Sequence, residues 1–397
     1  MIRRALRALS ILVCALAASI GQSRVASSGE VRIVVIERED DALYEPASTS
    51  DGLYRLQRYR PFVGAELGLA DISPLGMAAD VTFRLERWSL PPEDSIEGSI
   101  RQAASRGIAA ALLDLPVEDL KLAAKAMPSG KIALFNIREQ SDDLRRDVCG
   151  TDLFHVIPSQ SGLTDALAQF VVRRNWRKIL MMVGPEESDT TLAKSFERSA
   201  KKFGARIVDT KPFVLGNDPR NREQTNVTLM TSAVDYDALF LADTVGDFGR
   251  FVPYRMSRPR PVFGTEGLQA SGWYFTSERY GAPQLNRRFE RLARRQMTDP
   301  DWSAWVAVRT VGEIVARTAA RAPSEIVRNL REGAIPIDLS KGVTGSFRKW
   351  DQQLRQPIML HTYNAVIDFA PLDGFLHEHS TLDTLGLESR DVPCGRP

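Results

Sequence analysis

The sequence lacks the features that mark the commonest enzymes and nucleic-acid-binding proteins. Its formal net charge is only +2 over 397 residues, so no strong positive field would attract nucleic acid. It contains no GxSxG, HExxH, Walker-type or GxGxxG motif, and isolated carboxylates such as Glu313 and Asp351 form no recognisable acid/base pair. We therefore predict a protein that is not an enzyme, binds no nucleic acid and carries no cofactor.

Long apolar runs are absent as well, and the one near the N-terminus is short. Three arginines in the first seven residues precede an apolar run at 8–20, and small residues follow up to Ser27. This order predicts a secretory signal over residues 1–27 with an ambiguous cleavage site, because the run is too short to span a bilayer. The alternative is an N-terminal membrane anchor. We expect a periplasmic protein without stable membrane insertion.

Cysteine is scarce, with Cys14, Cys149 and Cys394 as the only three. Cys14 lies in the predicted signal, and the spacing of the other two fits neither a zinc ribbon nor a CxxC redox pair. Two cysteines in an exported chain predict one disulfide, Cys149–Cys394, which would join the C-terminus to the middle of the chain. The alternative is a pair of free thiols.

The chain is long enough for two domains, and strands alternate with helices in two consecutive sets. The first set has predicted strands at 31–36, 81–88, 108–114 and 131–136, with helices at about 53–70, 94–106 and 117–126. The second set begins near 155–161, with helices at 162–173, 189–203 and 221–232 and strands at 177–184, 205–210, 237–242 and 261–264. Such an order is typical of doubly wound parallel sheets.

The remaining chain is mixed, with predicted helices at 302–321 and 324–332 and a hairpin whose strands lie near 345–350 and 357–369. We predict an α/β protein of two lobes, joined by a hinge that the chain crosses three times. Lobe one would comprise residues 31–155 and 267–343, and lobe two residues 156–266 and 344–397.

This order of elements resembles the type I periplasmic binding proteins, especially the branch that binds branched-chain amino acids. The segments KILMMVG to FGARIV, YDALFLAD, PVFGTEGL and DWSAWVAVRTVGEIVART carry the resemblance, which covers nearly all of the chain after the signal. It implies a monomeric protein that captures a small solute and delivers it to the permease of an ATP-binding-cassette importer.

Other segments are similar to a narrower subgroup, the transporter binding proteins associated with pyrroloquinoline-quinone-dependent alcohol oxidation. They are HVIPSQSGLTDALAQF, DWSAWVAVRTVGE, KGVTGSFRKWDQQLRQPIML and GFLHEHSTLDTLG. This similarity names no ligand. Amino-acid binders of this fold hold their ligand with a Ser/Thr-rich loop after the third strand, whereas this chain has Asp114-Leu115-Pro116 there. That departure argues against leucine-type binding.

Topology alone places a candidate binding site at the carboxyl ends of the strands, where ligands of open parallel sheets bind. In a two-lobed protein both sets of strand ends would face the cleft. The candidates of lobe one are Glu37, Asp40, Asp114, Asn136, Arg138 and Glu139, and those of lobe two are Glu186, Asp189, Asp243, Asp247 and Glu266, with Trp273 close behind.

The candidate set is rich in carboxylates, which repel one another across a closing cleft unless something positive enters. We therefore expect a cationic ligand, or a hard metal ion or its complex held by oxygen donors. The alternative is that loop carboxylates are solvated or cap helices, as Asp189 would do as an N-cap. Trp273 would either stack on an apolar ligand or pack in the hinge.

Other roles stay open at the level of sequence. The same fold would serve as a ligand sensor, or as a metal- or cofactor-handling accessory of a quinone-dependent dehydrogenase. An enzyme that works through carboxylates alone is a further alternative. His377 and His379 would share one face of a strand, but no third ligand has a fixed spacing, so no metal site is assigned.

Overall fold

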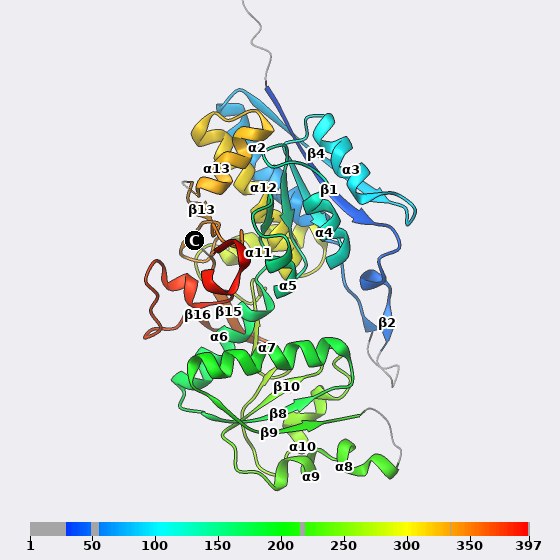
Figure 1. Ribbon diagram of the computed structural model, residues 1–397, viewed down its shortest axis with the longest axis vertical. Coiled ribbons are helices and arrows are strands. Elements are labelled where there is room, and N and C mark those ends of the chain that lie inside the picture. Colours follow the sequence, from blue (N-terminus) through cyan, green and yellow to red (C-terminus); the bar gives the residue numbers. More distant parts are fainter. Residues whose placement is uncertain (1–28, 49–54, 215–218, 334, 396–397) are drawn as a thin grey trace, which may run out of the picture.

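Two lobes lie one above the other along the longest axis of the molecule (Figure 1). The computed structural model describes residues 29–48, 55–214, 219–333 and 335–395, and the predicted secretion signal lies outside them. No helix within these ranges combines the length and the apolar character that a membrane crossing requires.

The first lobe is built on a parallel sheet with the strand order β4-β1-β5-β6-β7. Its central strands β1 and β5 are rich in Val, Ile, Leu and Ala because helices cover both faces of the sheet, and every side chain of β5 is buried. The bounds are Gly29–Arg38 (β1), Val81–Leu90 (β4), Ala110–Asp114 (β5), Ala133–Asn136 (β6) and Leu153–His155 (β7).

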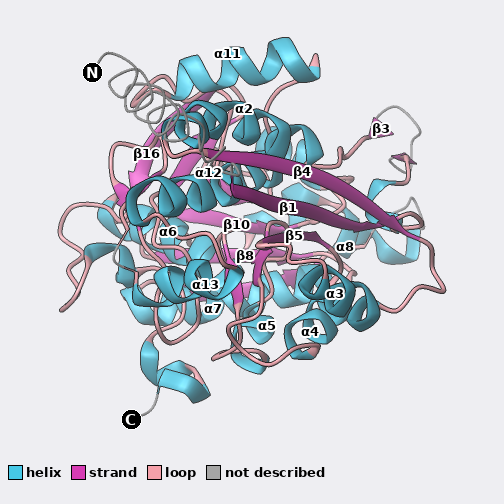
Figure 2. Cartoon of the chain, turned by 90° about the horizontal axis from the view of Figure 1, so that it is seen from above, coloured by secondary structure: helices cyan, strands magenta, loops and turns pink. Residues whose placement is uncertain are grey.

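Helices form a layer on each face of this sheet (Figure 2). On one face α2 (Phe62–Ala78) packs along α12 (Asp299–Thr318), beside α11 (Ala282–Ala293) and α13 (Pro323–Glu332). The other face is covered by α3 (Ile96–Ser105), α4 (Val117–Lys125) and α5 (Asp142–Asp147).

The second lobe repeats this plan with the parallel strand order β11-β10-β8-β9. The strands are Lys178–Val183 (β8), Arg206–Pro212 (β9), Ala238–Ala242 (β10) and Val262–Gly264 (β11). On one face α6 (Gln160–Arg173) and α7 (Glu187–Phe203) pack, with Phe196 stacked on Phe240 at 4.0 Å between ring centroids. The short helices α8 (Arg222–Thr225), α9 (Val227–Ser232) and α10 (Val252–Arg255) lie after β9 and β10, and residues of α9 and α10 join the core on the other face.

A third, antiparallel sheet follows the order β12-β15-β16, with β12 at Gln269–Ser271, β15 at Ile358–Thr362 and β16 at Ala365–Ala370. Two small pairs complete the described strands. They are β2 (Ala47–Ser48) with β3 (Arg55–Leu56), and β13 (Ile337–Asp338) with β14 (Thr344–Gly345).

The hairpin near the C-terminus differs from the sequence prediction. Residues 345–350 are predicted as its first strand, but the hairpin is formed by β15 and β16 around a turn at Tyr363-Asn364. The segment before it instead lies along β7, through a parallel bridge between His155 and Gln353. Sequence periodicity missed this because Gln353 pairs with a strand about 200 residues away.

Four helices also differ from prediction, and one of them, α5, is not predicted. The sequence predicts a helix from about residue 53, whereas α2 begins at Phe62, after Pro61. The predicted helix at 221–232 is interrupted at Asn226, whose side chain accepts a hydrogen bond from the Leu229 N–H and so begins α9 as a new helix. Helix α11 is not predicted either.

The described chain passes from one hydrophobic core to the other near Pro158, Gly272 and Pro357, and these three crossings lie side by side. A fourth passage, after Gly386, ends at Cys394, which is bonded to Cys149 of the first lobe. A Cβ atom on Gly272 would lie 2.9 Å from the Pro158 ring, and Gln356 Nε2 donates to the Val156 carbonyl at 2.5 Å. From the first lobe, Asp299 Oδ2 accepts from the Gly272 N–H at 2.8 Å. Close packing at Gly272 and side-chain hydrogen bonds to the backbone therefore join the crossings at the hinge.

The predicted division of the chain assigns all residues from 344 onward to the second lobe. In the structure, Phe347 and Leu354 pack in the hydrophobic core of the first lobe. Ile358 and Leu385 pack in the core of the second lobe.

Candidate functional site

The carboxyl ends of the first sheet's strands face the second lobe, because β7 ends at His155 and the chain crosses at Pro158. The register brings three predicted residues together there. Glu37 pairs with Asp114 across β1 and β5, and Asn136 ends the next strand, opposite Leu113. Parallel strand order thus assembles part of the predicted site from positions about 100 residues apart.

Asp114 is the most deeply buried carboxylate at this edge, with no exposed surface. Its Oδ1 accepts a 2.6 Å hydrogen bond from the Tyr44 hydroxyl and lies 3.4 Å from Nη1 of Arg138. Burial raises the pKa of Asp114 to about 6, although Arg138 and Tyr44 oppose the increase. The carboxyl therefore changes its charge near neutral pH.

Glu37 is held on one side only. Its Oε1 accepts from Arg87 Nη2 at 2.7 Å and from Ser89 Oγ at 3.0 Å. Its Oε2 lies 3.7 Å from Nη1 of Arg60, and the same nitrogen lies 3.9 Å from Oδ2 of Asp114. Within the described residues these three buried atoms have no hydrogen-bond partner. One donor and two acceptors thus form ion-pair contacts but no hydrogen bond.

Arginines compensate the carboxylates of this edge. Arg138, itself buried, contacts Asp41, Asp114 and Glu139, while Arg60 lies over the Tyr44 ring at 4.5 Å. The prediction of a cationic ligand assumes that the carboxylates lack partners, and this assumption is wrong for Glu37 and Asp114. The positive charges that balance them are supplied by the chain itself.

Asn136 organises the loop after β6. Its Oδ1 accepts from the backbone N–H groups of Arg138 and Glu139, at 3.2 and 2.9 Å, and its Nδ2 donates to the Glu139 carbonyl at 2.7 Å. It also contacts Nδ1 of His155, whose pKa burial lowers well below the usual value. Asn136 therefore fixes the conformation of the loop after β6, and its side-chain amide is already hydrogen-bonded within the chain.

In the second lobe, the two most buried candidates accept hydrogen bonds from backbone N–H groups. Asp189 accepts at Oδ1 from the Thr244 N–H and at Oδ2 from the Glu186 N–H, closing a capping box at the start of α7. Asp243 accepts from the N–H groups of Gly246, Phe248 and Gly249. Asp189 therefore caps α7 as the alternative proposes, but at the third helical position of the capping box, because Glu186 is the N-cap.

The other candidates lie apart from this constellation. Asp40 and Glu186 are exposed, Glu266 is half-buried and Asp247 is buried. Trp273 is buried in the first-lobe core, stacked on Trp302 at 5.8 Å, with its indole N–H donating to Asn286. Its ring therefore packs near the hinge and is not positioned to cover a ligand. Among the described residues, no group of three or more His, Cys, Asp or Glu side chains could hold a metal ion.

Sequence reasoning missed Tyr44, Arg60 and Arg87. Arg87 and Ser89 share one face of β4, and Ser89 pairs with Glu37, so the period of two would have found them once the register was known. Tyr44 lies in a short 3-10 turn (Ala42–Tyr44) and Arg60 just before α2, where no periodicity exists. Only the folded loop brings them to Asp114.

The raised pKa of Asp114 gives a pH-dependent contribution to stability. Because an unfolded Asp titrates near about 3.9, the folded chain binds this proton more tightly, and the carboxyl favours folding most at low pH. The contribution is lost as the pH rises from about 4 to about 6. Relative to wild type, Asp114→Asn should therefore gain about 2–3 kcal/mol of unfolding free energy between pH 4 and pH 7.

Urea unfolding of both proteins at the two pH values measures this difference. Glu118→Gln, which changes an exposed carboxylate on α4, serves as the matched control and should show no such change. A difference between Asp114→Asn and wild type that is the same at both pH values would contradict the assignment.

Comparison with known proteins gives a match of fold only. No protein-family model and no curated protein matches the sequence. A periplasmic binding protein from Burkholderia mallei aligns with a TM-score of 0.63 and 12% identity, covering 92% of this chain and 98% of that one. A branched chain amino acid ABC transporter periplasmic ligand-binding protein from Burkholderia xenovorans LB400 has a TM-score of 0.64 and 11% identity, with 86% and 94% covered.

A leucine-, isoleucine-, valine-, threonine- and alanine-binding protein from Brucella ovis, in its closed conformation, gives a TM-score of 0.63 at 11% identity, with 86% and 92% covered. Likeness at such low identity concerns the fold. The chain has the α/β fold of the type I periplasmic binding proteins, with two lobes that each contain a parallel sheet.

Proposed function

We propose that this chain is an exported solute-binding protein, which captures a small ligand between its lobes and delivers it to the permease of an ATP-binding-cassette importer. The observation that carries the proposal is the constellation at the carboxyl edge of the first sheet. Glu37 Oε2, Asp114 Oδ2 and Arg60 Nη1 are buried, adjacent and without hydrogen-bond partners there. Buried polar atoms normally form hydrogen bonds, so the unpaired atoms at this edge favour a polar ligand.

The chemistry of these atoms favours a small ligand with a hydroxyl or amino group. Such a group would donate to the carboxylate oxygens of Glu37 and Asp114, and a hydroxyl would also accept from Arg60. A hard metal ion is less favoured, because Arg60, Arg87 and Arg138 already balance the negative charge. The Ser/Thr-rich loop of amino-acid binders is replaced by Asp114-Leu115-Pro116, so the ligand need not be an amino acid.

The association with quinone-dependent alcohol oxidation remains part of the proposal. It rests on the four sequence segments that resemble that subgroup. Short alcohols, their acids and pyrroloquinoline quinone are therefore the first ligands to test, beside amino acids, polyamines, calcium and lanthanide ions.

The test is a thermal-shift screen of the chain without its predicted signal, followed by calorimetry of any hit. A ligand that binds only the folded state raises the melting midpoint by mass action. We expect a hit among small hydroxylated or amino compounds, and at least about a tenfold loss of affinity in Glu37→Gln or Asp114→Asn, since each replaces a charged acceptor by a neutral amide and weakens a buried hydrogen bond. Glu118→Gln should bind as wild type does.

A shift with calcium or lanthanide ions alone, abolished by a chelator, would replace solute import with metal handling. Affinity unchanged in both Glu37→Gln and Asp114→Asn would remove this edge from the binding site.

A further inference from the structure

The C-terminal segment contacts both lobes. We call residues 381–394 the strap. It comprises the 3-10 turns Thr381–Thr384 and Ser389–Asp391 and the start of a last turn at Pro393–Gly395. In Figure 1 it is the red segment between the lobes, near the C-terminus and close to α5 and α6. Its two ends are held by different lobes.

The first half of the strap is fixed to the second lobe. Lys202 Nζ, on α7, donates to the Thr384 carbonyl at 2.8 Å, and Gln169 Nε2, on α6, donates to Thr384 Oγ1 at 3.1 Å. The Gly386 N–H donates to Oδ2 of Asp165, which is fully buried, at 2.8 Å. Leu385 between them packs in the second-lobe core. Polar and apolar contacts therefore anchor this half together.

The second half of the strap is fixed to the first lobe by a covalent bond. Cys394 forms a disulfide with Cys149, as the sequence predicts, with 5.9 Å between the Cα atoms. Cys149 directly follows Val148, which is buried in the first-lobe core behind α5. The chain thus leaves the second lobe near Gly386 and is bonded to the first lobe eight residues later.

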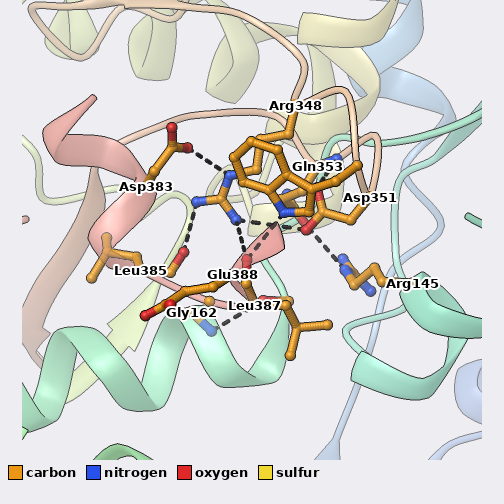
Figure 3. Close-up of polar contacts among 12 residues, drawn as sticks. Arg145, Gly162, Arg348, Asp351, Gln353, Asp383, Leu385, Leu387 and Glu388 are labelled. Carbon is orange, nitrogen blue, oxygen red and sulfur yellow. Dashed lines mark hydrogen bonds and ion pairs between the residues drawn. The ribbon is translucent and has the colours of Figure 1, made fainter. Parts of the chain in front are cut away.

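A buried arginine joins the strap to the first lobe along the way (Figure 3). Arg348 follows Phe347, a residue of the first-lobe core, and its Nε donates to Asp383 Oδ1 at 2.8 Å. Its Nη2 donates to the Leu385 carbonyl at 2.7 Å, and the Trp350 indole donates to the Leu387 carbonyl at 3.2 Å. These contacts cross from one lobe to the segment anchored on the other.

We propose that the strap is a built-in limit on lobe opening, and that the Cys149–Cys394 disulfide makes that limit permanent. Rotation about the hinge moves the Thr384–Gly386 anchor relative to Cys149, so the residues between must extend. Seven residues, 387–393, reach at most about 25 Å when fully extended. In the structure they are folded into a turn with Leu387 and Val392 buried, which makes extension costly.

The consequence for ligand capture rests on the proposed function. If the strap restricts the range of lobe positions in the open state, closure of the lobes costs less conformational entropy. The ligand affinity is then higher, because less of the interaction free energy is needed to order the lobes. A chain without the bond should therefore open further and bind its ligand more weakly.

Distances between the lobes test the strap without any ligand. Spin labels on p-acetylphenylalanine at exposed Lys125 of α4 and Lys194 of α7 leave the cysteines untouched, and pulsed electron resonance measures their separation. The double variant Cys149→Ser/Cys394→Ser should give a broader distribution that extends to longer distances than that of the disulfide-bonded wild type.

A second variant distinguishes the effect of strap length on the distances from the effect of losing the disulfide. Inserting four Gly/Ser residues after Asp391 keeps both cysteines, and it should broaden the distribution although the disulfide forms. Arg390→Gln is the matched control in the same segment, because this side chain is 80% exposed, and it should leave the distances unchanged.

Wild-type distances in both the double variant and the lengthened strap would overturn the proposal. If the double variant does not fold, the lengthened strap decides alone. Because no ligand is present, failure of the strap proposal is distinct from failure of the proposed function, which the thermal-shift screen tests.

Discussion

Asp383→Ala should lower the free energy of unfolding by about 3–5 kcal/mol, because it removes a buried carboxylate shared by two arginines and leaves Arg348 with only the more distant Asp351, at 3.6 Å. The Asp383 carboxylate is fully buried and accepts from Nε of Arg348 and Nε of Arg355, both at 2.8 Å. The Arg348 side chain is only 3% exposed, so water cannot replace the lost partner. Urea unfolding of the disulfide-bonded chain at pH 7 measures the loss.

Asp373→Ala is the matched control, because Asp373 pairs with Arg173 at 3.5 Å while 97% exposed. An exposed pair contributes about 0–1 kcal/mol, so this variant should unfold almost as wild type does. Equal effects of the two substitutions would show that the Arg348–Asp383 contact in Figure 3 does not stabilise the strap.

Gly64→Ala should destabilise the first lobe by about 3 kcal/mol, at the upper end of overpacking effects. Gly64 lies where α2 packs along α12, and a Cβ there would come within 2.1 Å of the Asp301 carbonyl oxygen. One turn later, a Cβ on Gly68 would lie 2.9 Å from Cβ of Val308. The obstacles include backbone, so the helices themselves would have to separate.

Gly98→Ala gives the opposite expectation within the same lobe. Its added Cβ would lie 3.4 Å from the nearest atom, in Ser95, and its backbone is helical. Alanine favours a helix over glycine by about 0.5–1 kcal/mol, so this variant should be slightly more stable. Thermal melts of both variants test the pair. A Gly64→Ala protein as stable as Gly98→Ala would disprove the close helix contact.

The fold could be predicted because its signals are local. Short apolar runs rich in Val, Ile, Leu and Phe, such as Val31 to Ile36 and the residues of β10, favour strands covered on both faces. Their alternation with helices then allows few topologies. Glu37, Asp114 and Asn136 were found by the same logic, since parallel strands end at one edge.

The partners of these residues could not be predicted, because they come from loops and from unrelated positions in the chain. Tyr44 reaches Asp114 from a 3-10 turn, and Arg60 reaches Glu37 from the residues before α2. A carboxylate in a sequence gives no sign of whether an arginine will neutralise it. For this reason, the sequence predicts an excess of negative charge at the site, whereas arginines balance Glu37 and Asp114 in the structure.

The sequence by itself determined the two sets of strands and helices, the edge at which Glu37, Asp114 and Asn136 meet, and the pairing of Cys149 with Cys394. The strands, the helices and the edge follow from hydrophobic periodicity, and the disulfide follows because only two cysteines lie outside the predicted signal. Only the tertiary structure decided that arginines balance the carboxylates, that Trp273 packs in a core, and that residues 381–394 contact both lobes. Some of these contacts, such as that between Gln169 and Thr384, join residues more than 200 positions apart, and only packing of the whole chain brings them together.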